Sequence, residues 1–69
     1  MAKIADEDVK RMKQIAEASL RTPPKELYHL EHEFTEDMAK KYGRAEAMRL
    51  LTKVWALSER LRNREAEQW

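Results

Sequence analysis

The chain has 69 residues, with 14 basic and 13 acidic side chains and a formal net charge of +1, so no bulk charge draws it toward nucleic acid. It has no cysteine, one glycine and two prolines. This excludes disulfides and thiolate metal sites, and it leaves too few turn residues for a β-sandwich or barrel. Helix-forming residues dominate, and we therefore expect one all-α domain over residues 1–69.

The first helix is expected over residues 6–21. Asp6 supplies a capping side chain, and the acidic residues that follow it favour the positive end of the helix dipole. An apolar stripe recurs at spacings of three and four residues: Val9, Met12, Ile15, Ala16, Ser19 and Leu20. The helix ends before Pro23, because the residue that precedes a proline is pushed out of the α region.

The second helix is expected over residues 23–42. Thr22 is predicted to cap it, and the two prolines that follow are tolerated in a first helical turn. Its predicted buried stripe is Leu27, Leu30, Phe34, Met38 and Tyr42, with Tyr28 at the edge. Gly43 follows two lysines, and cations before a glycine are a stop signal. We predict a break at Gly43; the alternative is one continuous helix, at a cost of about 1 kcal/mol.

The third helix is expected over residues 45–67, with an apolar arc that covers about half of its circumference. The arc comprises Leu57, Leu50, Leu61, Val54, Ala47, Leu51, Trp55 and Met48. A helix packed on one neighbour needs only about 100° of apolar arc. We therefore predict a helical hairpin of the second and third helices, with the first helix packed across it, and a dimeric bundle formed through Met48 and Trp55. Complete coverage of the arc by the first two helices is the alternative.

The segment EDMAKKYG, residues 36–43, resembles the first helix and turn of a helix-turn-helix motif. Ala39 is the small residue four positions before the turn glycine, as in that motif. The second half departs from the motif, because Arg44, Arg49 and Thr52 are polar where apolar residues are expected. The residues therefore favour an ordinary corner between two helices over a DNA-reading motif.

Basic residues form a stripe on the third helix: Arg49, Lys53, Arg60 and Arg64. They fall within about 60° of one another and span ~22 Å along the helix axis. Such a stripe can follow a phosphate backbone, so a DNA-binding regulator or accessory protein is the alternative function. A solvated face that keeps the protein in solution is the other interpretation.

Two histidines and two glutamates share one face of the second helix: His29, His32, Glu33 and Glu36. Imidazoles and carboxylates one turn apart can bind a divalent cation. However, this face lies opposite the predicted buried stripe, and helical di-iron sites take their ligands from several helices. We therefore expect no metal site and no cofactor, and we assign the histidines to pairs with the glutamate four residues on.

No arrangement of residues predicts catalysis: there is no glycine-rich loop, and no histidine lies near a serine in the sequence. We expect a non-enzymatic regulatory, adaptor or inhibitor-type protein that presents a helix face to another protein. The predicted contact residues are Met48, Trp55, Tyr28 and Trp69, and the predicted partners are a second copy and an unidentified protein. No apolar run reaches the length of a signal peptide or membrane span, so a cytoplasmic location without membrane contact is expected.

Overall fold

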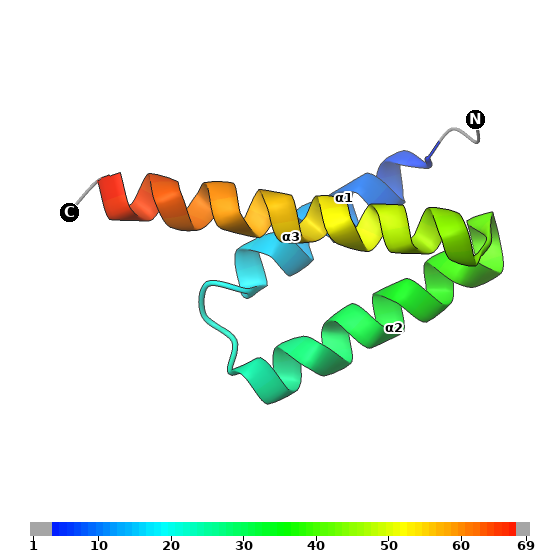
Figure 1. The fold of residues 1–69 in the computed structure, drawn as a ribbon, viewed down its shortest axis with the longest axis horizontal. Helices are drawn as coiled ribbons and strands as arrows, with labels where there is room; N and C mark the ends of the chain where they lie inside the picture. The colour runs from blue at the N-terminus through cyan, green and yellow to red at the C-terminus, as the bar shows by residue number, and fades with distance from the viewer. Residues whose placement is uncertain (1–3, 68–69) are drawn as a thin grey trace.

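The computed structural model describes residues 4–67, and these residues form three helices and no strand. Helix α1 spans Asp6–Ala18, α2 spans Pro24–Tyr42 and α3 spans Arg44–Glu67. Figure 1 shows α2 running beside α3 and α1 crossing behind α3. The predicted all-α fold of three helices is therefore confirmed. Within residues 4–67, no helix is both long enough and apolar enough to cross a membrane.

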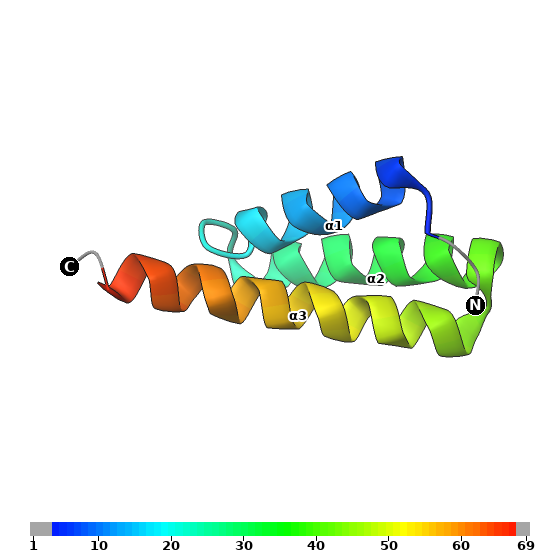
Figure 2. The ribbon, with the colours of Figure 1, turned by 90° about the horizontal axis from the view of Figure 1, so that it is seen from above.

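Gly43 forms the whole corner between α2 and α3. Its N–H donates to the carbonyl of Ala39, and its own carbonyl accepts from the N–H of Ala47, both at 3.0 Å. The residue thus closes one helix and opens the next, with φ +93° and ψ 158°. Side chains disfavour this backbone conformation, and glycine adopts it readily. The predicted break at Gly43 is confirmed, and Figure 2 shows the resulting antiparallel hairpin.

Two predicted helix caps are wrong, because backbone groups begin the helices instead. The residue before α1 is Ala5, whose carbonyl accepts from the N–H groups of Asp8 and Val9, so Asp6 already lies inside the helix. The residue before α2 is Pro23, whose carbonyl accepts from Leu27, so Thr22 lies one position too early to cap. Neither helix start carries a side-chain cap.

Helix α1 ends at Ala18, earlier than the predicted residue 21. Leu20 and Arg21 continue as a tight turn, in which their N–H groups donate to the carbonyls of Glu17 and Ala18. Hydrogen bonds over three residues wind the chain more tightly than an α-helix. The turn thus redirects the backbone before Pro23, where the apolar spacing had predicted that α1 continues.

The core consists of apolar residues that recur at helical spacing on all three helices. Its buried members are Met12, Ile15, Ala16, Phe34, Met38, Ala47, Leu50 and Val54, with Leu51 also buried. Leu30 departs from the predicted stripe, since its side chain is 37% exposed. Helix α1 packs more extensively against α3 than against α2. The flank of α2 that carries Leu30 is therefore only partly covered, by the region of α1 around Ile15.

The apolar arc of α3 is covered from two sides. Ala47, Leu50 and Val54 are buried in the core, which also includes side chains from α1 and α2. Met48 and Trp55, on one flank of the arc, are left half exposed. Coverage by the first two helices thus accounts for most of the arc, and a dimer is not needed to bury it. Residues 62–67 are all exposed, and Figure 1 shows this end of α3 extending beyond the loop between α1 and α2.

A buried carboxylate fastens the start of α1 to the end of α2. Asp8 is buried, with its side chain only 5% exposed. Its carboxylate accepts hydrogen bonds from the Tyr42 hydroxyl at 2.6 Å and from the Lys41 ammonium at 3.0 Å. The Tyr42 hydroxyl in turn accepts from the N–H of Ala5 at 3.2 Å. The hydrogen bond from Tyr42 lowers the pKa of Asp8 most strongly, and Lys41 adds to the effect against the opposing cost of burial.

One turn further along α1, Arg11 makes a second link to α2. Its guanidinium donates to the Asp37 carboxylate at 2.7 Å and lies 5.6 Å from the centre of the Phe34 ring. The planar guanidinium can pair with a carboxylate and rest on an aromatic face at the same time. These two polar links join α1 to α2, the two helices that pack least extensively on each other.

Candidate protein-binding surface

The large exposed apolar side chains gather on the α2–α3 hairpin. Tyr28 is 66% exposed on α2, and Trp55 and Met48 are 50% and 48% exposed on α3. Met48 and Trp55 lie two turns apart on one flank of α3, as the helical period requires. The structure therefore places three of the four predicted contact residues on one hairpin. The fourth, Trp69, lies outside the described residues.

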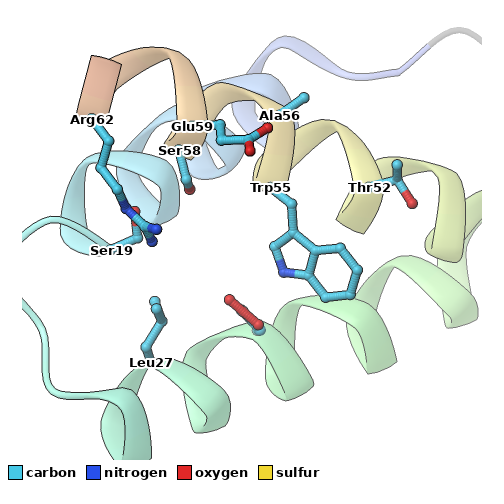
Figure 3. A pocket seen from close by; sticks show the side chains of 9 residues that line it. Ser19, Leu27, Thr52, Trp55, Ala56, Ser58, Glu59 and Arg62 are labelled. Atoms are coloured by element: carbon cyan, nitrogen blue, oxygen red, sulfur yellow. The ribbon is translucent and has the colours of Figure 1, made fainter. Parts of the chain in front are cut away.

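Two adjoining hollows lie between α2 and α3, and Trp55 lines both of them. We call them together the hairpin groove, whose main lining residues are Leu27, Tyr28, Glu31, His32, Leu51 and Trp55. Figure 3 shows the Trp55 side chain extending from α3 toward α2, while Leu27 extends from α2 toward the same space. Arg62 and Ser19 line the hollow next to Leu27, at the end that lies farther from Trp55. The larger of the two hollows has a volume of about 440 Å³.

Charged side chains line the hairpin groove together with its apolar side chains. Glu59 and Arg62 line the hollow on the Leu27 side of Trp55, and Glu31 lines both hollows. The hydroxyl of Ser58 is satisfied by its own helix, since it donates to the Val54 carbonyl at 3.0 Å. Interfaces between proteins likewise combine apolar and aromatic contact residues with polar groups.

Within residues 4–67, no salt bridge forms the predicted pairs between the histidines and glutamates of α2, and both imidazoles lie beside Tyr28. The His32 ring is stacked on the Tyr28 ring with centroids 6.2 Å apart, and His29 meets the same ring edge-on. Glu36 lies 3.8 Å from Arg44 instead. Glu33 is exposed. Within residues 4–67, no three His, Asp or Glu side chains lie close enough together to hold a metal ion.

The residues of the predicted basic stripe on α3 have different surroundings in the structure. Arg49 lies 3.9 Å from Glu46 of its own helix. Lys53, Arg60 and Arg64 are exposed, and they form no salt bridge with any residue in the described part of the chain. Arg60 and Arg64 line a groove between α1 and α3 that was not predicted from the sequence.

The α2–α3 hairpin does not have the geometry of a helix-turn-helix motif. That motif joins two helices at about 90–120° through a turn of three or four residues. Here Gly43 alone connects α2 and α3, and Figure 2 shows the two helices lying side by side in opposite directions. The likeness of residues 36–43 to the motif is therefore local.

Comparison with protein-family models, with curated proteins and with solved structures finds no match to this chain. Its function is therefore inferred from the surfaces described above.

Proposed function

We propose that the protein is a small non-enzymatic regulatory, adaptor or inhibitor-type protein that binds another protein through its hairpin groove. One observation carries the proposal: Trp55 is half exposed in the middle of the groove, with Tyr28 exposed among its lining residues. Tryptophan and tyrosine are enriched among the residues that dominate binding energy at protein interfaces. A partner that covers both rings removes a large apolar area from water.

The shape of the hairpin groove favours a helical segment as the contacting element of the partner. The two hollows follow one another between α2 and α3, and Trp55 separates them. A helix laid along such a groove presents apolar side chains at i, i+3 or i+4, and i+7. Two such side chains would enter the two hollows on either side of the indole.

A second copy of the chain is one proposed partner. Met48 and Trp55 lie on the same flank of α3 and are both half exposed. In a two-fold dimer, the same flank of each copy meets the other, so both residues are covered at once. Sedimentation equilibrium of the wild type against Met48→Ser/Trp55→Ser tests this, with Arg49→Ser/Lys53→Ser as the matched control. A wild type that stays monomeric at every concentration contradicts the dimer.

Site-specific photo-crosslinking tests the hairpin groove as a protein-binding site. A photoreactive phenylalanine analogue replaces Trp55 in one variant and Lys53 in the control; both positions are exposed on α3. We expect a discrete cross-linked species from position 55 and none from position 53. Equal labelling from both positions, or none from position 55, contradicts the proposal.

DNA binding, the second function expected from the sequence, has one supporting observation. Lys53, Arg60 and Arg64 are exposed and have no carboxylate partner within residues 4–67. The hairpin supplies no recognition helix set at the angle of a helix-turn-helix motif, so protein binding is the proposal that the geometry supports better. Labelled duplex DNA is therefore one of the probes titrated with the wild type and with the variant that changes Arg60 and Arg64.

A further inference from the structure

A second groove lies between α1 and α3, away from the hairpin groove. We call it the α1–α3 groove, and it is lined by Lys13, Ala16, Glu17, Leu57, Arg60, Leu61 and Arg64. Its volume is about 360 Å³. None of these residues lines the hairpin groove. The two surfaces can therefore be occupied and tested independently.

The floor of the α1–α3 groove is apolar. Ala16 is fully buried, and Leu57 and Leu61 are half-buried side chains that pack against the core. Each leucine thus contributes to the core on one side and leaves part of its surface in the groove. A ligand that contacts this floor with apolar groups gains from removing that surface from water.

The rim of the groove is cationic. Lys13 stands on α1, and Arg60 and Arg64 stand on α3, against the single carboxylate of Glu17. None of these side chains forms a salt bridge with a residue in the described part of the chain. The chain as a whole is close to neutral, with a formal net charge of +1, so this positive rim is a local feature. Its charge complements an acidic ligand.

We propose that the α1–α3 groove binds an acidic amphipathic segment of a partner protein. The apolar side chains of the segment would cover Leu57 and Leu61, and its carboxylates would pair with Lys13, Arg60 and Arg64. Arginine suits this role because its guanidinium binds a carboxylate through two parallel hydrogen bonds. The sugar-phosphate backbone of DNA satisfies the cations equally well, but it has no apolar side chain to cover the leucine floor. The combination of floor and rim therefore favours a peptide.

Fluorescence anisotropy with defined probes tests the proposal. The first probe is a labelled helical peptide with leucines at i, i+3, i+4 and i+7 and glutamates on both flanks of that stripe. The second probe carries serine in place of each leucine and has the same charge. The third is a labelled DNA duplex. Each is titrated with wild type, with Arg60→Glu/Arg64→Glu, and with Lys25→Glu/Lys40→Glu, which changes the charge equally at exposed positions outside both grooves.

We expect the leucine peptide to bind, and the groove variant to weaken its binding by about tenfold or more, equivalent to ~1.4 kcal/mol. The control variant should change it by less than about twofold, and the serine peptide should bind about tenfold more weakly than the leucine peptide. Circular dichroism checks that both variants keep the helix content of the wild type. We expect this because the substituted residues are exposed.

Four results overturn the proposal: equal losses in both variants, equal binding of the two peptides, no peptide binding at all, or duplex DNA binding that exceeds peptide binding and disappears in the groove variant. The last result assigns the rim to nucleic acid. The variant Trp55→Ala separates this proposal from the hairpin groove, because it should leave peptide binding unchanged. Failure of one proposal therefore leaves the other standing.

Discussion

Replacing Gly43 with alanine is expected to destabilise the protein through the backbone alone. Gly43 has φ +93° and ψ 158°, a region that only glycine occupies readily. Apart from Gly43 itself and its two chain neighbours, no atom lies within 4 Å of the position that an added Cβ would take, so the methyl group clashes with no other part of the protein. The cost is therefore conformational, and residues held in such regions cost about 1–3 kcal/mol each.

This cost is large relative to the total stability of so short a chain. At 0.05–0.15 kcal/mol per residue, a protein of this length has a free energy of unfolding of roughly 3–10 kcal/mol. For small domains, each kcal/mol shifts the melting temperature by about 4–8 °C. The variant Gly43→Ala should therefore melt roughly 4–24 °C below the wild type.

Urea unfolding followed by far-UV circular dichroism measures the effect. Arg44→Ala is the matched control, because Arg44 is an exposed neighbour and the change should stay within about 0.5 kcal/mol. A Gly43→Ala variant that remains monomeric and unfolds within about 0.5 kcal/mol of wild type would refute the argument. The variant can also avoid the unfavourable backbone conformation at residue 43 if α2 and α3 join into one helix and two opened chains pair. Sedimentation velocity detects such a dimer.

Three further predictions concern the core and the buried carboxylate. Phe34→Ala removes a fully buried ring and should cost about 3–5 kcal/mol, a large part of the free energy of unfolding, which thermal melts will show as a strongly lowered melting temperature. Tyr42→Phe should cost about 1–2 kcal/mol in urea unfolding, because its hydroxyl both donates to Asp8 and accepts from the backbone. The pKa of Asp8 is lower in the folded protein than its ordinary value of 3.8, so its stabilising effect is present above that pH and is lost as the pH falls through the folded pKa. Unfolding free energies measured between about pH 5 and pH 2 should fall less steeply for Asp8→Asn than for the wild type; equal slopes would contradict this.

The helices and most of the core follow from local chemistry that the sequence displays directly. Phe34 and Met38 on α2, and Leu50 and Val54 on α3, recur at helical spacing, and all four are buried. The turn at Gly43 was also predicted from the sequence, because a single glycine after two lysines in a helical chain marks the end of a helix. Helical period and turn chemistry act over a few residues, so one sequence suffices to detect them.

Asp8 shows where local reasoning failed. In the sequence it is one of three acidic residues at a helix start, which suggests an exposed charge near the helix dipole. In the structure it is buried against Lys41 and Tyr42, more than thirty residues away along the chain. No periodic pattern marks such a contact, since it depends on how α1 crosses α2.

The candidate surfaces were likewise predicted only in part from the sequence. The exposure of Met48 and Trp55 agrees with their place at the flank of the apolar arc of α3. That Tyr28 and His32 line one hollow with Trp55 depends on the pairing of α2 with α3. Likewise, Arg60 and Arg64 were visible as a stripe, but their joint groove with Lys13 exists only because α1 packs on that side of α3.

By itself, the sequence determined that this protein is helical, that its chain turns at Gly43 and which apolar residues form most of the core, because helix periodicity and glycine conformation are properties of neighbouring residues. Tertiary structure alone decided that α1 and α2 cover most of the α3 arc, that Asp8 is buried, and that two separate grooves flank α3. These outcomes depend on how three helices share one core, and packing between distant segments is a property of the whole chain.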